Sequence, residues 1–396
     1  MRTYACHIDN GRTPVNTPAG KSTTTTGRII STSLIPASHL GAIRSTKPRG
    51  DRPGVTQSYA ALSQVIKESG LLRRTPVFYS LLVGGLALAL GGAITGFVLL
   101  GDSWYQLLIA AALGIIFTQF AFFAHEASHR AVLASGRAND RVGRFVATVM
   151  VGISYQWWMT KHTRHHANPN RLGKDPDIEF DTISFTEEDA ARQRGLIGWI
   201  TRRQGWLFFP LLLLEGLNLH VTSIRSLFER RAIPGRALEL TLIALRLGAY
   251  VAVVFWALPL GMAFAFLGVQ LAVFGVYMGA SFAPNHKGMP LVPADAKLDF
   301  LSKQVLTSRN ITGRWTSPLM GGLNHQVEHH LFPSMPRPHL GRAREIVREH
   351  CRSLGIPYTE TTLVDSYGIV IRYLNRVGLA ARDPFDCPAA GELRRR

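Results

Sequence analysis

Hydrophobic positions are concentrated in a few long blocks of the chain. Four blocks approach the roughly 20 residues that an α-helix needs to cross the hydrocarbon core of a bilayer. They are residues 77–100, 104–123, 240–258 and 260–283. A helix satisfies its own backbone hydrogen bonds, as a segment surrounded by lipid must. The pattern therefore predicts two pairs of membrane-spanning helices.

Two weaker apolar blocks, residues 143–159 and 206–222, are shorter or are interrupted by polar residues. Glu215, Asn218 and His220 lie in the second of them. Judged by composition alone, each block could cross the membrane or lie in its interface.

The connectors between the blocks predict the orientation of the chain. The turns at 101–103 and 258–260 contain no Lys or Arg, whereas residues 130–236 and the chain after Lys287 are rich in both. Basic loops usually remain in the cytoplasm. We therefore expect a multi-pass protein of a bacterial plasma membrane, with the basic regions and both termini in the cytoplasm.

Composition agrees with a membrane protein that has basic flanks. The 396 residues carry a net charge of +18, yet the mean hydropathy is +0.09, so the apolar residues must be segregated. The orientation bias and attraction to anionic lipid account for the charge, and no nucleic-acid partner is predicted. The three cysteines have no CxxC spacing, which argues against a disulfide framework or a cysteine metal site.

The two ends of the chain differ from its middle. Residues 1–70 are rich in Arg, Ser, Pro and Gly and poor in acid, which predicts a disordered basic tail; an organelle transit peptide has a similar composition. The expected organisation is this tail, a membrane domain over residues 71–350, and a cytoplasmic C-terminal tail over residues 351–396.

Histidines form three clusters, here called boxes: HEASH at 125–129, HTRHH at 162–166 and HQVEHH at 325–330. Residues three or four positions apart share one face of a helix, so each box directs its imidazoles one way. Imidazole is the commonest nitrogen ligand for iron, copper and zinc. Because the boxes hold eight of the 14 histidines, we predict one shared metal site.

HEASH taken alone matches the zinc-protease pattern, with His125 and His129 as ligands and Glu126 as general base. That hypothesis predicts a single zinc and gives the other two boxes no role. A catalytic zinc needs three protein ligands and a structural zinc needs four. Eight imidazoles exceed this number, so two ions are predicted.

A shared site also constrains the number of membrane crossings between boxes, which must be even. Two firm spans separate the second box from the third. The weak blocks at 143–159 and 206–222 must then be interfacial or re-entrant.

Other histidines lie near the boxes. His286, in FAPNHKGM, follows the last span and is predicted to be an additional ligand. His220 is either a ligand or a hydrogen-bonded interfacial residue. His325 could orient a ligand without touching the metal.

Carboxylates near the boxes have candidate supporting roles. Asp175 and Asp177 follow the second box in a turn-rich segment, where a carboxylate could accept a ring N–H from a ligand or cap the turn. The turn role is favoured for Asp177. Glu126 and Glu328, each beside a ligand, are further candidate partners of the metal-binding imidazoles.

The ordered segments HEASH, WWMTKHTRHHANPNRLGKDPDI, FAPNHKGM and GGLNHQVEHHLFPSMPR resemble the membrane fatty acid desaturase family over about residues 70–350. Gln326 at the third box is similar to the subgroup that includes front-end and related bacterial acyl desaturases. Many members have a histidine there, so Gln326 is a candidate metal contact or supporting residue, and so is Asn285, which precedes His286 in the chain. The resemblance implies an all-α integral membrane fold, with four transmembrane helices below a cytoplasmic helical cap that holds a di-iron centre. It implies eight ligands: His125, His129, His162, His165, His166, His286, His329 and His330.

The implied activity is oxygen-dependent formation of a double bond in a fatty acyl chain at two irons per chain. The chain contains no His-Pro-Gly-Gly haem motif, so a separate ferredoxin, cytochrome-b5-type protein or flavin reductase is expected to supply electrons. Membrane lipid and a fatty acyl substrate, as acyl-CoA or acyl-lipid, are the other expected partners. A hydroxylase or ketolase on the same scaffold remains an alternative. The position of the double bond, the acyl length, the carrier and the oligomeric state stay open.

Overall fold

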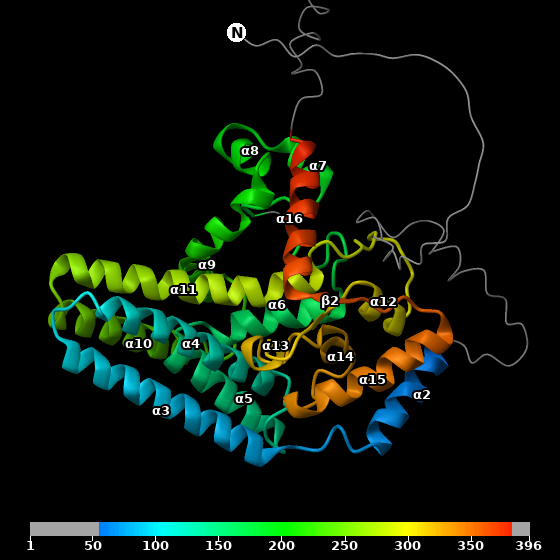
Figure 1. Cartoon of the computed structure of the whole chain (residues 1–396), viewed down its shortest axis with the longest axis horizontal. Coiled ribbons are helices and arrows are strands. Elements are labelled where there is room, and N and C mark those ends of the chain that lie inside the picture. Colours follow the sequence, from blue (N-terminus) through cyan, green and yellow to red (C-terminus); the bar gives the residue numbers. More distant parts are fainter. Residues whose placement is uncertain (1–54, 180, 382–396) are drawn as a thin grey trace, which may run out of the picture. The chain divides into compact units, whose positions relative to one another are not determined.

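The structure, a computed structural model, describes residues 55–381 except Phe180, and these residues are mostly helical (Figure 1). Predictions about residues 1–54 and the two termini lie outside the described residues. The four firm apolar blocks form α3 (Pro76–Leu100), α4 (Gln106–Ser128), α10 (Arg236–Ala257) and α11 (Leu260–His286). All four are long and apolar enough to cross a membrane.

The two weak apolar blocks fold differently from each other. Residues 206–222 lie within one continuous helix, α9 (Gln204–Leu227), which is a fifth helix long and apolar enough to span. Residues 143–159 are divided among α5 (Gly136–Phe145), the π-helix η1 (Val146–Val151) and α6 (Tyr155–Ala167). Gly152, with φ of 92°, ends η1. This block therefore forms no continuous span.

The folded part of the chain extends beyond the predicted boundaries at residues 70 and 350. Helix α2 (Val55–Glu68) buries Leu62 and Ile66 against α12 (Phe300–Leu306), α14 (Gln326–Leu331) and α15 (Arg337–Leu354). Helix α16 (Leu363–Leu379) packs Leu374 and its neighbours against α9. Both segments are amphipathic helices that pack against the rest of the domain, so neither is a simple tail.

Short elements complete the part that surrounds the boxes. They include α7 (Glu187–Arg192), α8 (Gly195–Thr201) and α13 (Thr316–Leu319). A small parallel pair joins β1 (Asn310–Thr312) to β2 (Glu360–Thr362). It holds the segment before α14 against the segment before α16.

Helices α9 and α11 cross closely at two glycines, Gly216 and Gly275. A Cβ on Gly275 would overlap the backbone nitrogen of Gly216. Small residues allow such close packing between apolar helices. The crossing therefore fixes the distance between the two helices.

Replacing Gly275 with Val is expected to push α9 and α11 apart and to lower the free energy of unfolding by about 1–3 kcal/mol. Thermal denaturation in detergent micelles would measure this loss. Gly268→Val is the control on the same helix, because a Cβ there meets no atom within 4 Å. Equal stability of the two variants would contradict the role of the crossing.

Candidate metal centre

Four helices bring the histidines of all three boxes together. The end of α4 supplies His125 and His129, α6 supplies His162, His165 and His166, and α14 supplies His329 and His330. His286 is the last residue of α11. The structure thus assembles all eight predicted ligands, although ligation itself stays a prediction. They form one group of five, called group A, and one group of three, called group B. Group A is His125, His129, His162, His166 and His329; group B is His165, His286 and His330.

Group A surrounds His162. Its Nε2 atom lies 2.9 Å from Nε2 of His125 and 2.8 Å from Nε2 of His129. On the other side of the group, the Nε2 atoms of His166 and His329 are 3.1 Å apart. The ligand atoms all lie within 4.8 Å of one another, which is close enough for one ion.

Group B adjoins group A through the parallel rings of His166 and His330, whose centroids are 4.2 Å apart. Nε2 of His165 lies 3.3 Å from Nε2 of His286. The amide nitrogen of Gln326 is 2.9 Å from the same His286 atom. Asn285 donates to Oε1 of Gln326 at 3.2 Å and so orients that amide. Gln326 therefore lies beside group B, and its contact with a metal stays a prediction.

The Nδ1 atoms of group B are all held by oxygen atoms. His165 faces Asp175 at 3.0 Å, His286 faces the Thr307 carbonyl at 2.9 Å, and His330 faces Oε1 of Gln304 at 2.9 Å. Each oxygen accepts an N–H, so a neutral ring is left with its Nε2 lone pair free. The Nε2 atoms of His165 and His286 then face each other at 3.3 Å, close enough to share a proton or a metal ion. This donor set fits a borderline transition metal.

Burial keeps most of these imidazoles neutral. It lowers the pKa of His129 to about 4 and the pKa values of His162 and His329 well below the usual range. Burial also lowers the pKa of His165, but the carboxylates of Asp177 and Asp175 outweigh that effect and raise it overall. Neutral imidazole is the form that binds metal.

Asp175 is fully buried and has both predicted roles: it accepts a ring N–H from a histidine and it caps the turn. It accepts from His165 and also from the backbone N–H groups of Asn170 and Asp177, at 2.7 and 2.9 Å. Asp177 is more than a turn residue: it pairs with Lys161 at 3.0 Å and lies 3.3 Å from Nδ1 of His165. Both carboxylates therefore orient His165.

Replacing Asp175 with Asn is expected to weaken iron retention and activity by about 10–100-fold. An amide offers one oxygen where three N–H groups now find acceptors, and its NH2 group would face a backbone donor. Iron remaining after dialysis against graded chelator is the measurement. The control is Asp189→Asn, a half-buried carboxylate in the first turn of α7 that belongs to neither histidine group. If the two variants retained equal iron, this role of Asp175 would be refuted.

His220 and His325 lie outside both groups. The ring nitrogens of His220 contact the carbonyls of Gly216 and Val151, at 2.6 and 3.2 Å. Of the two roles predicted for His220, metal ligand or hydrogen-bonded residue, these contacts match the second. His325 lies next to Gly341, and burial lowers its pKa to about 4. In the described part of the chain, neither side chain forms a hydrogen bond with any of the eight predicted ligands, so neither is placed as a metal ligand.

The predicted partnership of Glu126 and Glu328 with neighbouring ligands is wrong. Glu126 accepts from Tyr79 at 2.9 Å and forms a buried ion pair with Arg337. Glu328 accepts from Asn310 at 2.7 Å and from Tyr358 at 2.6 Å, and burial raises its pKa to about 7. On a helix, a residue adjacent to a ligand points to a different face.

Three residues at the site carried no signal in the sequence. Gln304 and Thr307, which hold His330 and His286, come from a short helix far from any box. Trp158 stacks on His162 with ring centroids 4.6 Å apart.

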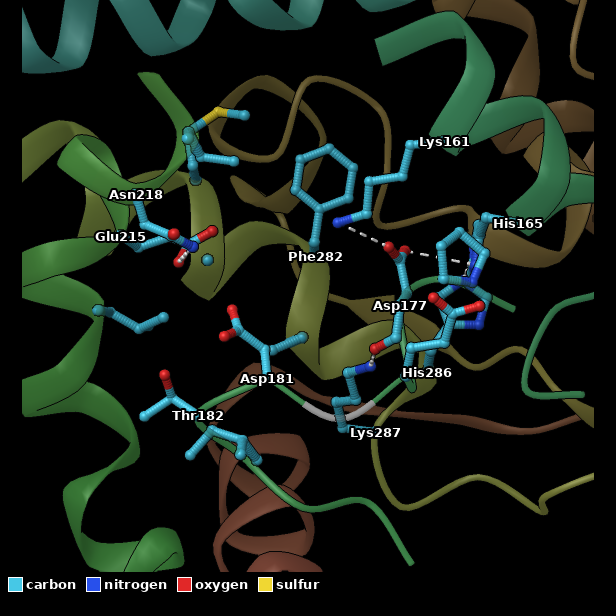
Figure 2. Close-up of a pocket in the computed structure, with 18 of the residues that line it drawn as sticks. Lys161, His165, Asp177, Asp181, Thr182, Glu215, Asn218, Phe282, His286 and Lys287 are labelled. Atoms are coloured by element: carbon cyan, nitrogen blue, oxygen red, sulfur yellow. Dashed lines mark hydrogen bonds and ion pairs between the residues drawn. The ribbon is translucent and has the colours of Figure 1, made fainter. Parts of the chain in front are cut away.

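Two cavities reach the histidines. The larger, of about 410 Å³, is lined by residues of α6, α9 and α11 and by His162, His165, His286 and Gln326 (Figure 2). The smaller, of about 40 Å³, is almost wholly apolar and borders His125. Trp158, Leu219, Met278 and Phe282 line both. An elongated apolar molecule can therefore lie along both metal groups.

Apolar helices, clustered imidazoles that could hold metal ions and an adjoining cavity with an apolar wall are typical of a membrane metalloenzyme that acts on apolar substrates. Residues 102–362 match the family described as "Fatty acid desaturase". The chain belongs to the fatty acid desaturase family and is an oxidoreductase.

Several curated proteins are similar to this chain over most of its length. The Delta(8)-fatty-acid desaturase of Helianthus annuus is 28% identical, covering 83% of this chain and 75% of the plant protein. The Delta(6)-fatty-acid desaturase fat-3 of Caenorhabditis elegans is 26% identical, covering 82% and 75%. Fatty acid desaturase 3 of Bos taurus is 26% identical, covering 86% and 77%. These relatives are eukaryotic, so they give no support to the predicted bacterial membrane.

Proposed function

We propose that the chain uses two irons, held by groups A and B, to introduce a double bond into a fatty acyl chain with O2 as co-substrate. The observation that carries this proposal is the pair of adjoining imidazole groups with inward nitrogen atoms. When bound, iron supplies the oxidising power that removes hydrogen from an unactivated C–H bond. Two ions fit the eight ligands better than one.

The protein's own contribution is to position the acyl chain and to exclude water. Phe282 and Trp158 separate the large cavity from the small one, with ring centroids 6.0 Å apart. The two rings are in edge contact, so an acyl chain lies along the pair rather than between the rings. His162 is in the wall of the large cavity and His125 is in the wall of the small one. Correct placement of one C–C bond accounts for much of the rate that such a site can provide.

Four crossings and an interfacial α9 agree best with the assembled boxes. Near the start of α9, Gln204 donates to Leu374 at 3.0 Å, and near its end His220 meets Val151 of η1. Glu239, at the start of α10, accepts from Ser154 at 2.6 Å, just before the second box. Both ends of α9 thus lie on the histidine side, and Figure 1 shows α9 oblique to α11. By the distribution of basic residues, we assign that side to the cytoplasm.

A separate acidic electron carrier is the proposed donor. Lys303 donates to the carbonyl of Ala167, and Gln304 donates to the carbonyl of His166 at 2.9 Å, so a basic surface lies directly outside group A. Exposed Arg164 and Lys174 extend this surface. Positive charge near the metals would steer an acidic partner toward them.

Metal analysis of the purified protein, together with mass spectrometry of lipids from an expressing host, tests this proposal. We expect about two iron atoms per chain, as the ligand number requires, and new unsaturated acyl chains that depend on oxygen. One zinc per chain without iron would refute it. Hydroxylated or keto products would instead support the alternative that the chain is a hydroxylase or a ketolase on the same scaffold.

A further inference from the structure

We infer that the large cavity selects an acyl lipid whose head group donates hydrogen bonds and carries no net negative charge. This inference rests on the proposed desaturase function and names the carrier class that the function leaves open. Two observations carry it: the charges of the cavity wall and the lipid-facing rim of the cavity.

The cavity wall is richer in acid than in base, although the whole chain has a net charge of +18. Two lysines, Lys161 and Lys287, face four carboxylates: Asp177, Glu179, Asp181 and Glu215. Asp177 is neutralised by Lys161 at 3.0 Å, and Glu179 by Arg164 at 3.0 Å. The local charge therefore opposes the bias of the rest of the protein.

Asp181 and Glu215 remain without an ion-pair partner among residues 55–381. Figure 2 shows both on the side of the cavity away from His165. Glu215 accepts a hydrogen bond from Asn218 at 3.1 Å. Lys161 partly offsets the charge of Glu215 from beyond ion-pair distance, whereas Asp181 and Asp177 add to the negative potential around it. Carboxylates accept hydrogen bonds and repel phosphate groups. This side suits a hydroxyl, amide or ammonium group.

The same wall opens toward lipid. Leu214 lines the cavity and is 63% exposed, and its neighbours Leu213 and Leu217 are also exposed. On an interfacial α9, exposed leucines contact acyl chains of the membrane. A lipid can thus enter sideways, with its head at Glu215 and its chain toward Phe282.

A buried donor in the wall supplies a further selection. The indole nitrogen of Trp158 is buried and has no hydrogen-bond acceptor within the described residues. Buried donors normally have a partner, so an acyl carbonyl or hydroxyl oxygen of the substrate would satisfy it. An amide-linked or hydroxylated head group offers both the donor for Glu215 and the acceptor for Trp158.

Binding of matched amphiphiles to the iron-loaded protein in non-ionic micelles tests this inference. The probes share one saturated 18-carbon chain, brominated near the methyl end, and are N-stearoylethanolamine, stearylamine, stearate and stearoyl-CoA. Their quenching of tryptophan fluorescence reports occupancy, and Trp158→Phe verifies the source of the signal. We expect the ethanolamide and the amine to bind at least about tenfold more tightly than the two anions, because several like charges are avoided.

The variant that combines Glu215→Gln with Asp181→Asn should reduce this preference to about twofold or less, since the unpaired charges are gone. Glu229→Gln, a carboxylate paired with Arg231 beyond the end of α9, should keep it. Tighter binding of stearoyl-CoA to the wild-type protein, or an unchanged ranking in the double variant, would overturn the inference. Lipid analysis of the expressing host tests the proposed function separately from the binding experiment. Absence of unsaturated product would count against the desaturase function, whatever the order of probe affinities.

Discussion

Replacing His329 with Ala is expected to abolish unsaturated product while the protein remains in the membrane. His329 reaches group A from α14, and its Nε2 lies 3.1 Å from that of His166. Its loss removes one of the five group A nitrogens and the α14 contribution to that group. Lipid composition of an expressing host and iron content of the purified variant are the two measurements. Iron should fall by about one atom per chain, because one group loses a ligand.

The matched control is His339→Ala. His339 donates to the carbonyl of Leu71 at 2.7 Å and belongs to neither group. The His339→Ala variant should therefore retain its iron and still form unsaturated product. Undiminished product from His329→Ala would refute the shared site, and equal loss from His339→Ala would show that stability rather than ligation limits activity.

The box histidines were predictable because helical spacing is a local property. His162, His165 and His166 lie within five residues of one another, so their common direction follows from the sequence alone. His286 was predictable from its position at the end of an apolar block. The partners of the ring nitrogens were harder to predict: Gln304, which accepts from Nδ1 of His330, lies 26 residues before it, and only the folded chain brings the two side chains together.

Helix α9 shows what composition cannot decide. Its length and apolar character equal those of a membrane span, yet its two ends contact elements on the histidine side. Parity of crossings predicts an interfacial or re-entrant segment here, because it uses the relation between distant boxes; this placement stays a prediction. The length and composition of a single segment carry no information about where distant boxes lie relative to one another.

Glu126 illustrates the opposite error, in which a local pattern suggested the wrong chemistry. The zinc-protease pattern makes it a general base, but it lies in a buried ion pair with Arg337, 211 residues away, and accepts from Tyr79. The pair joins α4, which carries the first box, to α15 and α3. Its role is to hold these helices together.

Replacing Glu126 with Gln is expected to lower the free energy of unfolding by about 3–5 kcal/mol, because the Arg337 guanidinium is left buried without a counter-charge. The side chains of Arg337 and Glu126 are only 6% and 9% exposed, so water cannot compensate. Loss of product should follow loss of folded, iron-loaded protein. Thermal denaturation and iron content, measured on the same preparations, would show this.

Adding Arg337→Met to Glu126→Gln should restore most of the stability and the product, since no unpaired charge remains in the core. A general base would behave differently. Glu126→Gln would then be as stable as the wild-type protein and inactive, and the second substitution would rescue nothing. The double variant therefore separates a structural ion pair from the catalytic role that HEASH suggests when it is considered alone.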